Sequence, residues 1–541
     1  MEKNIMWWKN VLVYQIYPLS FKDSNQDGIG DIPGIISKLP YLKDFGVDVI
    51  WLSPVYESPM DDNGYDISNY QAINPIFGRN EDIDELINQV HKAGMKIIMD
   101  LVVNHTSDQH HWFLESKKSM DSKYRDYYIW KSKPEPAITS IFSGPAWTYD
   151  EATNQYYFHL FSKRQPDLNW QNKNLRFEIY QMMNYWLDKG IDGFRMDVIE
   201  LIGKDVHKGI LADGPHLETY LNEMYENCFK GRDLINVGEM GGISVERAKE
   251  LTSNPKLGLH MTFQFSHLGI DEVPGLGKWA LKPYEPYRLK EILIQNNHIF
   301  EDGGWNALFL SNHDQVRQVS RFGSLKYRTK SAQMLSTMLY LQRGTPYLYM
   351  GEELGMTGIK FNEMNDYKDI ETINYYKDAK TKGIKHEDIM ESIHHKSRDN
   401  SRTPFQWSDE PYAGFSTVKP WLAVNPNYKE LNLENELKDE QSVYHYTKKL
   451  FQIRKAYDVF VNGAFIPIDE TSKHTFIYLR SNGQHEILVV TNMTDKYVTC
   501  DLGQFNSFKV LLENEETILS KETKLKPYHA AIFIKELTYD N

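Results

Sequence analysis

Three acidic residues of this sequence, Asp197, Glu239 and Asp314, stand at the ends of short apolar runs of the kind that form buried strands. The three segments are Ile191–Asp197, Leu234–Glu239 and Ala307–Asp314. In a parallel barrel the C-terminal strand ends meet at one mouth, so such acids come together. Carboxyl groups crowded into a partly dry site acquire different pKa values, so that one can be a nucleophile while another donates a proton. Cleavage of a glycosidic bond needs this arrangement.

Arg195 lies two residues before Asp197, so both side chains are expected on the same face of the strand. A guanidinium keeps its charge at any physiological pH and lowers the pKa of a neighbouring carboxyl group. The spacing therefore predicts that Arg195 keeps Asp197 ionised.

Composition excludes several classes of partner. The 541 residues carry a net charge of −13, so no basic field would attract nucleic acid or an anionic membrane. Only Cys228 and Cys500 are present, which fits a reducing compartment and argues against a disulfide scaffold. The first residues show no signal-peptide pattern, and no apolar stretch reaches about 20 residues. We expect a cytoplasmic, monomeric protein that acts on a small molecule.

Strand and helix patterns alternate along most of the chain. The predicted strands are Val11–Tyr17, Val47–Leu52, Lys96–Val103, Asp192–Val198, Leu234–Gly238, Met261–Phe265, Ala307–Ser311 and Pro346–Met350. The clearest predicted helices are Glu81–Ala93, Asn174–Lys189, Tyr287–Phe300, Lys330–Leu341 and Val443–Tyr457. Repeated strand–helix units imply a parallel sheet, and eight strands imply its closure. The predicted fold class is α/β, a (β/α)8 TIM barrel.

Two segments interrupt this alternation, and near the C-terminus the pattern changes to short strands without intervening helices. Residues 105–173 are rich in Trp, Tyr, Ser and Pro and predict an inserted subdomain after the third strand. Residues 352–440 form a polar insertion too long for an ordinary loop, so we expect it to be functional or to carry short helices. The barrel would comprise residues 1–104 and 174–460, and residues 461–541 predict a C-terminal antiparallel β-sandwich domain.

Five short blocks occur in an order that resembles the α-amylase superfamily, glycoside hydrolase family 13, over essentially the whole chain. They are Asp100–His105, Gln165–Trp170, Gly193–Asp197, Val237–Glu239 and Asn312–Asp314. The second block, together with Arg398–Trp407, resembles the oligo-1,6-glucosidase and dextran-glucosidase group. The resemblance implies a retaining exo-α-glucosidase that acts on α-1,6 bonds at the nonreducing end of short isomalto-oligosaccharides, without an organic cofactor.

The same resemblance assigns roles to the residues of these blocks. Asp197 is expected to be the nucleophile, Glu239 the acid/base, and Asp314 the carboxylate that stabilises the transition state. His105 and His313 resemble a pair of hydrogen-bond donors to the hydroxyls of the nonreducing glucose.

A second acidic cluster lies at Met60–Asp66. In the resembled group, the acid matching Asp62 pairs with the arginine matching Arg398 and grips the terminal 4-hydroxyl, and Tyr65 matches a stacking ring. Such a pair would block longer nonreducing ends. Arg402 is an alternative to Arg398, and spacing alone leaves both open.

Further residues of the resembled pocket concern its walls and the linkage. Phe142 and Phe161 match aromatic walls. Val198, directly after the nucleophile, matches the valine of 1,6-specific enzymes, whereas maltose-preferring ones have threonine. The segment Met240–Gly242 lacks the bulky residue of many dextran glucosidases, which argues against activity on long dextran.

Residues 23–31 predict a metal loop. Oxygen-bearing side chains alternate along it, with a glycine that permits a sharp turn, as a hard cation such as Ca²⁺ requires. By resemblance the ligands would be the side chains of Asp23, Asn25, Asp27 and Asp31 and the carbonyl of Ile29. We expect a structural Ca²⁺ away from the catalytic residues.

Other functions are compatible with the same blocks. A trehalose-6-phosphate hydrolase shares most of them, and Gly277–Pro283 is reminiscent of that group. A sucrose isomerase and an α-1,4-glucosidase use the same machinery. The barrel of amino-acid-transporter heavy chains is a non-enzymatic alternative, but it lacks the catalytic acids.

Overall fold

The computed structural model describes residues 6–537, and its centre is a closed barrel of eight parallel strands. Around the barrel the strand order is β1-β13-β12-β11-β10-β9-β5-β2. The strands are β1 (Val13–Ile16), β2 (Val49–Leu52), β5 (Lys96–Leu101), β9 (Phe194–Met196), β10 (Val237–Glu239), β11 (Met261–Phe263), β12 (Asn306–Leu308) and β13 (Thr345–Tyr349). All eight lie within a residue of the predicted runs or inside them, and the TIM-barrel prediction is confirmed.

Alternation along the strands separates an inner from an outer apolar layer. Val13 belongs to a cluster inside the barrel with Val49 and Phe263, whereas Tyr14 and Ile16 pack outward with the helices. Because successive strand side chains point to opposite faces, both layers are filled from the same short strands. These strands are buried on both faces, as a parallel sheet requires.

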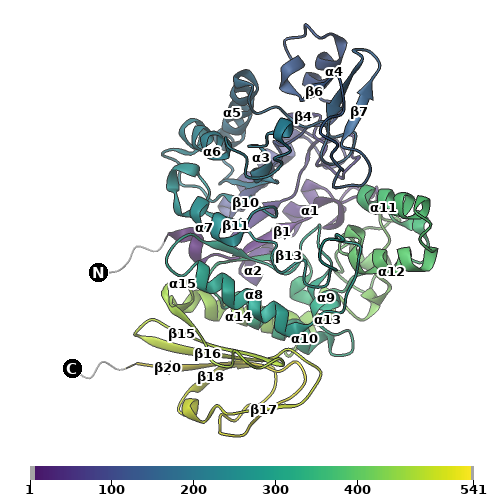
Figure 1. Ribbon diagram of the computed structural model, residues 1–541. Helices are drawn as coiled ribbons and strands as arrows, with labels where there is room; N and C mark the ends of the chain where they lie inside the picture. The colour runs from purple at the N-terminus through teal and green to yellow at the C-terminus, as the bar shows by residue number, and fades with distance from the viewer. Residues whose placement is uncertain (1–5, 538–541) are drawn as a thin grey trace.

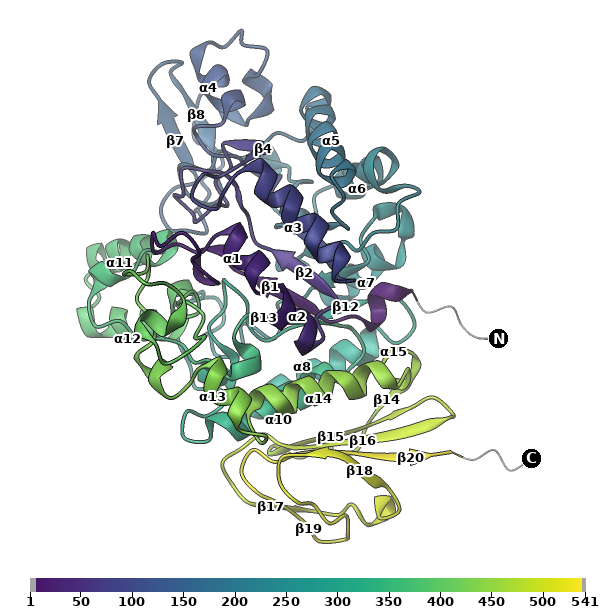
Figure 2. The same cartoon turned by 180° about the vertical axis from the view of Figure 1, so that it is seen from behind.

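Helices cover the outside of the barrel (Figure 2). The predicted helices are found as α3 (Asn80–Lys92), α5 (Lys173–Asp188), α8 (Pro286–Ile299), α10 (Arg328–Tyr340) and α14 (Val443–Ala456). Helix α10 differs from an ordinary surface helix because every residue from Ser331 to Tyr340 is buried. No helix in residues 6–537 is long and apolar enough to cross a membrane.

Strand β9 is shorter than predicted. The sequence pattern extends it to Val198, but β9 ends at Met196, and Val198 adopts a left-handed conformation with φ 36°. A strand cannot continue through a residue with positive φ. Asp197 therefore lies at the turn just beyond the strand rather than within it.

The two long segments after β5 and β13 fold into structure of their own. Residues 105–173 contain α4 (His111–Lys118) and a three-stranded sheet of order β6-β8-β7, formed by Trp130–Lys131, Gln155–Phe158 and Trp147–Asp150. The segment after β13 contains α11 (Ile370–Thr381), α12 (His386–Lys396) and α13 (Leu433–Lys438). In Figure 1, α4 and its sheet lie at the top, and α11 and α12 lie at one side.

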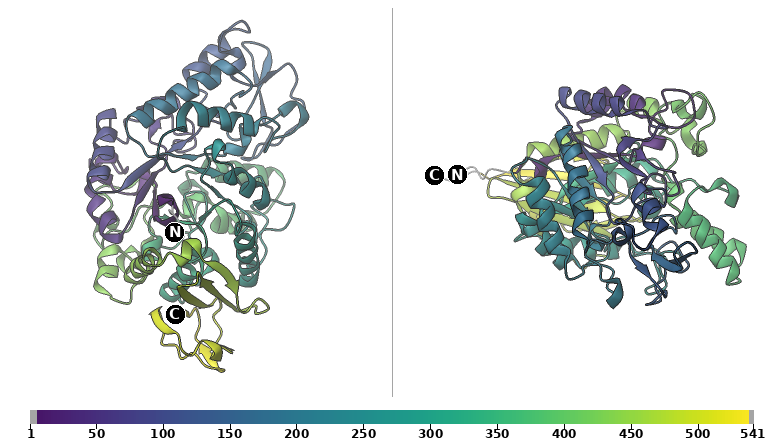
Figure 3. Two further views of the ribbon diagram at one scale, coloured as in Figure 1. Left: turned by 90° about the vertical axis from the view of Figure 1, so that its left-hand side faces the viewer. Right: turned by 90° about the horizontal axis from the view of Figure 1, so that it is seen from above.

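The C-terminal segment is antiparallel, as predicted. A five-stranded sheet of order β14-β15-β16-β20-β18 is joined by a two-stranded sheet of β17 (Val498–Cys500) and β19 (Thr523–Leu525). The strands of the larger sheet are β14 (Ala464–Pro467), β15 (Thr475–Ser481), β16 (His485–Asn492), β18 (Lys509–Glu513) and β20 (Ala530–Glu536). Figures 1 and 3 show this sheet against α10 and α14, at the opposite end of the molecule from α4.

Candidate active site

A cavity of about 400 Å³ is lined by all three predicted acids, Asp197, Glu239 and Asp314. They come from the C-terminal ends of β9 and β10 and from the segment after β12. The predicted residues Asp62, Tyr65, His105, Phe142, Phe161, Val198 and Arg398 also line it. Side chains distant in sequence therefore share one concave site at the barrel mouth, the position where barrel enzymes hold their catalytic groups.

Arg195 joins two of the acids. Its Nη1 lies 2.6 Å from Asp197 Oδ1 and 2.6 Å from Asp100 Oδ1, and its Nη2 lies 2.6 Å from Glu239 Oε2. The arginine is almost wholly buried and does not line the cavity itself. One guanidinium thus holds the Asp197 and Glu239 carboxyl groups side by side.

Burial changes the proton affinity of both acids. It raises the pKa of Glu239 to about 8, an effect that Arg195 opposes and that the nearby Asp197 and Asp314 reinforce. Burial also raises the pKa of Asp197, to about 7, against the opposing charge of Arg195. Arg195 thus opposes the effect of burial on Asp197 but does not outweigh it, so the predicted lowering of the pKa of Asp197 is not seen. Of the two acids Glu239 has the higher pKa, which suits it to be the proton donor of the pair.

Asp314 has the opposite electrostatic character. Its burial alone would raise its pKa, but His313, Arg398 and Arg402 together hold the pKa well below its usual range. Asp314 Oδ1 lies 2.7 Å from Arg402 Nη2 and 3.3 Å from Arg398 Nη1. This carboxylate stays ionised at neutral pH.

The structure separates the two arginines that the sequence left as alternatives. Arg398 lines the cavity, and its Nη2 lies 2.8 Å from Asp62 Oδ1 and 2.5 Å from Asp369 Oδ1. Arg402 is outside the lining and donates from Nε to the His313 carbonyl at 2.7 Å. Arg398 is therefore the arginine that can reach a ligand.

Aromatic rings surround the pair formed by Asp62 and Arg398. The Phe142 ring lies 4.9 Å from the Arg398 guanidinium and meets Phe161 edge to face, with 5.5 Å between ring centroids. Tyr65 stacks on His313 at 5.2 Å with an angle of 6° between the rings. His313 is not among the residues that line the cavity, although the neighbouring Asp314 is.

Val198 is strained and lines the cavity. A β-branched residue with positive φ is a genuine outlier, and such strain costs roughly 1–3 kcal/mol. The turn that it makes directs the Val198 N–H toward Glu239 Oε2, which accepts it at 3.1 Å. Alternation along a strand would point its side chain away from that of Asp197, but the left-handed turn brings it into the cavity wall.

Several lining residues were not predicted, and they are Ile141, Glu200, Leu201, Phe265, Gln315 and Glu371. Glu200 is buried, its pKa is raised to about 8 mainly by that burial, and its Oε1 accepts the Gly242 N–H at 3.0 Å. Lys278, from the segment Gly277–Pro283 that the sequence singled out, lies with its Nζ 2.6 Å from Glu371 Oε2. The position of Glu200 three residues after Asp197 was a usable signal, whereas the partner of Lys278, 93 residues away, left none.

The predicted metal loop lies apart from the cavity, since none of its residues lines it. Asp23 and Asp31 are buried, and their carboxylates accept hydrogen bonds within the loop and from its surroundings. Asp23 Oδ2, for example, accepts from Gly28 N–H at 2.9 Å and from Ser416 Oγ at 2.6 Å. Asn25 and Asp27 are exposed.

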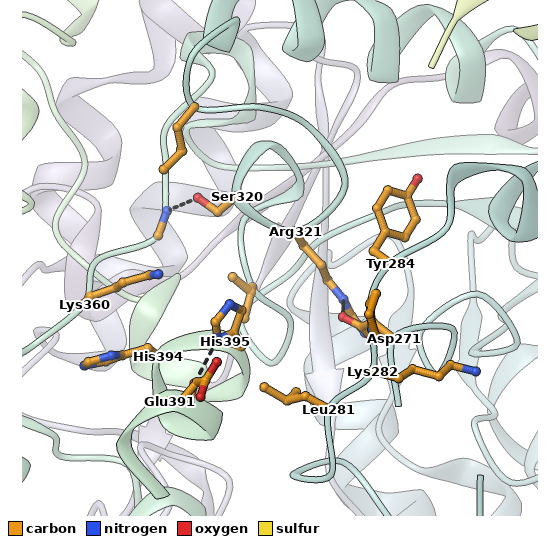
Figure 4. A pocket seen from close by; sticks show the side chains of 14 residues that line it. Asp271, Leu281, Lys282, Tyr284, Ser320, Arg321, Lys360, Glu391, His394 and His395 are labelled. Atoms are coloured by element: carbon orange, nitrogen blue, oxygen red, sulfur yellow. Dashed lines mark hydrogen bonds and ion pairs between the residues drawn. The ribbon is translucent and has the colours of Figure 1, made fainter. Parts of the chain in front are cut away.

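Figure 4 shows a second cavity, of about 570 Å³. Arg321 and Asp271 form part of its wall, with Arg321 Nη2 2.7 Å from Asp271 Oδ1. Arg321 also donates to Gln315 Oε1 at 2.9 Å, and Gln315 lines the first cavity. The second cavity is the larger, but none of the three acids lines it, so chemistry belongs to the first.

A (β/α)8 barrel whose mouth holds two buried acids on one arginine, beside a third ionised acid, has the fold and site of a glycoside hydrolase. Comparison with known proteins supports this class. The family described as alpha amylase, catalytic domain, matches residues 15–463. The chain belongs to this alpha-amylase family.

Relatives cover nearly the whole length of the chain. An oligo-1,6-glucosidase of Halalkalibacterium halodurans is 49% identical over 98% of this chain and 99% of its own. A glucan 1,6-alpha-glucosidase of Streptococcus pneumoniae is 49% identical over 97% and 98% of the two chains. The crystal structure of Bacillus licheniformis trehalose-6-phosphate hydrolase superposes with a TM-score of 0.92 at 43% identity, over 98% of this chain and 100% of that one.

Proposed function

We propose that this protein is a retaining exo-α-glucosidase that releases glucose from the nonreducing ends of short α-1,6-linked oligosaccharides. Similarity to an oligo-1,6-glucosidase and a glucan 1,6-alpha-glucosidase at 49% identity supports this substrate class. The α-1,6 linkage is inferred from these relatives, and the retaining mechanism is inferred from the geometry of the site.

The observation that carries the proposal is the sharing of one guanidinium by Asp197 and Glu239, each 2.6 Å from Arg195. Retaining glycosidases hold their two carboxyl groups about 5–5.5 Å apart, whereas inverting ones leave room for a water at roughly 6.5–9.5 Å. Two carboxyl groups on adjacent nitrogens of one arginine favour the shorter separation.

In the first step, Asp197 attacks the anomeric carbon while Glu239 gives its proton to the glycosidic oxygen. The bond to the leaving sugar breaks, and a covalent glucosyl–Asp197 ester forms. In the second step, Glu239 takes a proton from water, which attacks the anomeric carbon and releases glucose and Asp197. Asp314, kept ionised by Arg398 and Arg402, stabilises the positive charge that develops on the sugar in both transition states.

The pair formed by Asp62 and Arg398 would hold the end of the substrate. Both residues line the cavity and are buried, and Arg398 is braced from behind by Asp369. A paired arginine and carboxylate can bind two hydroxyls of a terminal sugar. A further sugar unit attached to the nonreducing end would have to lie where Asp62 and Arg398 stand. It would bury both charges without hydrogen-bond partners, so the pair favours exo action.

The second candidate, hydrolysis of trehalose 6-phosphate, is favoured by one observation, the position of Lys278 in the cavity wall. That lysine is already neutralised by Glu371 at 2.6 Å. Besides Arg398, the other ionisable lining residues are mostly acids, namely Asp62, Asp197, Glu200, Glu239 and Asp314, and of these Asp314 stays ionised at neutral pH. An acidic wall disfavours a phosphate dianion, so we rank the neutral oligosaccharide first.

A substrate panel tests the proposal. Isomaltose, panose, maltose, sucrose, trehalose 6-phosphate and dextran would be assayed side by side, with kcat/KM measured for each. We expect the highest values for isomaltose and panose, α-glucose as the first product, and low activity on dextran. A preference for trehalose 6-phosphate, or isomaltulose as the product from sucrose, would replace the proposal by the corresponding alternative.

We also propose that the loop of residues 23–31 binds a structural Ca²⁺. An all-oxygen ligand set suits a hard cation. Among residues 6–537 no three His, Cys, Asp or Glu side chains are arranged to hold a metal. The proposed set therefore depends on the Asn25 amide oxygen and the Ile29 carbonyl as well as on the carboxylates of Asp23, Asp27 and Asp31.

A cytoplasmic location and a monomeric state complete the proposal. Cys228 and Cys500 are both free thiols, and Cys228 is buried, which is consistent with a reducing compartment. Size-exclusion chromatography with light scattering tests the monomer.

A further inference from the structure

We propose that Gln15 is a positioning residue that fixes which ring nitrogen of His313 carries the proton. The proposal rests on the proposed function, because it concerns the same catalytic cavity. Gln15 lies on β1, does not line the cavity, and belongs to none of the sequence blocks that point to the activity.

Gln15 is a buried amide inside the barrel. It is the one polar residue in β1, and it points inward because Val13, two residues earlier, belongs to the inner cluster. Its Nε2 lies 2.8 Å from His313 Nδ1 and 3.1 Å from Ser53 Oγ. In this orientation of the amide its nitrogen faces both partners and its oxygen has no hydrogen-bond partner among residues 6–537. An amide nitrogen only donates, so the orientation makes His313 Nδ1 the acceptor.

The His313 ring is held in one orientation. It is fully buried between Tyr65, stacked at 5.2 Å, and Tyr17, stacked at 5.9 Å. Burial lowers the pKa of His313 to about 4, against the opposing effect of Asp314, so the ring is neutral near pH 7 and carries one proton. With Nδ1 accepting from Gln15, that proton resides on Nε2.

The protonated Nε2 lies beside the catalytic centre. It is 3.1 Å from Asp314 Oδ2, but the two atoms are not aligned for a hydrogen bond, and no other partner is present among residues 6–537. The N–H is therefore available to a sugar hydroxyl or to the Asp314 carboxylate once a substrate brings them into line. The opposite tautomer would present a lone pair to a carboxylate and would repel it.

The test is to observe the His313 proton directly. In protein with ¹⁵N-labelled histidine and glutamine, the His313 signals would be assigned by their loss in His313→Asn. We expect Nε2 to be protonated near pH 7 and a scalar coupling across the hydrogen bond between Gln15 Nε2 and His313 Nδ1. A proton on Nδ1, or the absence of that coupling in a resolved spectrum, would overturn the proposal.

A substitution links the tautomer to activity. The variant Gln15→Glu is studied at a pH at which the introduced carboxyl group is ionised, because burial raises the pKa of such a group. The ionised carboxylate can only accept, so the proton should move to Nδ1 and kcat/KM for isomaltose should fall roughly tenfold or more, as expected for loss of a hydrogen bond to a charged group. The matched control is Gln333→Glu on α10, a buried glutamine outside the cavity, which should leave the His313 spectrum unchanged at the same pH. Unchanged His313 signals in folded Gln15→Glu with its carboxylate ionised would contradict the proposal.

These experiments separate the tautomer from the identity of the substrate. The spectra are recorded without any sugar, so failure of the oligo-1,6-glucosidase proposal would leave the expected tautomer unaffected. If Gln15→Glu does not fold, the coupling in the unsubstituted protein decides the question alone.

Discussion

Glu239 shows how burial can dominate the protonation of a single residue. Its raised pKa, about 8, means that it is protonated at neutral pH and loses its proton as the pH rises through that value. As a general acid it is active only when protonated, so kcat/KM for isomaltose should fall on the alkaline side of about pH 8. Glu239→Gln should lower kcat for isomaltose by roughly 10²–10⁴, the range for general acid catalysis.

An activated aryl glucoside provides the matched measurement, because its leaving group needs no proton. With Glu239→Gln its kcat/KM should therefore fall much less than that of isomaltose, and azide should restore turnover of the same substrate in Asp197→Ala. An equal loss for both substrates in Glu239→Gln would assign the acid to another group, for which the buried Glu200 is the nearest candidate.

The linkage preference is also a prediction at the scale of one residue. Val198 presents an apolar wall to the cavity, and threonine has nearly the same shape with one added hydroxyl. A hydroxyl that binds the leaving sugar of a 1,4 linkage is worth about 0.5–1.5 kcal/mol, or roughly two- to tenfold in rate. Val198→Thr should raise kcat/KM for maltose relative to isomaltose by that factor.

The control is Val206→Thr, a buried valine nearby in the same loop that does not line the cavity. It should leave the ratio of the two substrates unchanged. Should folded Val198→Thr keep the wild-type ratio, the linkage would be determined elsewhere in the wall, where Lys278 and Glu371 are the first residues to test.

Individual site residues were predictable from the sequence where a neighbouring sequence pattern fixed their position. The acids were predictable because each follows a buried strand, and strand ends converge in a barrel. The choice between Arg398 and Arg402 was not, because it depends on which one faces Asp62, 336 positions away from Arg398. Gln15 left one signal, a lone polar residue inside an apolar strand, but its partner His313 could not be predicted.

At the scale of elements, the loop of residues 23–31 should respond to metal. A cation that binds only the folded protein stabilises it by mass action, by about 2.7 kcal/mol at a free concentration one hundred times Kd. We expect chelator to lower the melting temperature and added Ca²⁺ to restore it.

Asp27→Ala should abolish that response and retain most of kcat at low temperature, because no loop residue lines the catalytic cavity. The exposed Asp121→Ala serves as a control and should respond to chelator as the unsubstituted protein does. If chelator leaves the melting curve of metal-loaded protein unchanged, residues 23–31 are an ordinary turn and not a metal site.

Elements were predictable to the extent that their patterns were local. The eight strands are short, apolar and rich in β-branched residues, so each was visible in sequence. Their ends were less so: β9 stops at Met196 because the next turn needs a positive φ at Val198, and valine gives no sign of it. The folding of residues 352–440 into α11, α12 and α13 was expected only as short helices.

At the scale of the whole molecule, the C-terminal sheet supports the barrel. It covers α10, whose residues from Ser331 to Tyr340 are all buried, and Arg480 donates to the Leu341 carbonyl at 3.0 Å. Each large apolar side chain exposed by its removal would cost about 1.5–3 kcal/mol, and a domain is stable by only about 5–15 kcal/mol.

A chain that ends at residue 463 should therefore fail to give an active, cooperatively folding barrel, as measured by circular dichroism and by hydrolysis of isomaltose. The milder Arg480→Leu should lower the melting temperature and leave KM unchanged, since the sheet is remote from the cavity. Full activity of the shortened chain would show that the barrel is autonomous.

The position of Asp62 and Arg398 has a consequence for the order of events in a turnover. The terminal glucose enters the cavity first and lies against Asp62 and Arg398. It is therefore the last product to leave, and the rest of the substrate must diffuse away before it. After the leaving sugar is released and before glucose is released, the glucosyl ester on Asp197 faces the open end of the cavity. Any compound with a hydroxyl group can enter there. Water and other sugars compete to attack the glucosyl ester. At high isomaltose concentration part of the glucose should therefore be transferred to isomaltose, which gives longer oligosaccharides instead of free glucose.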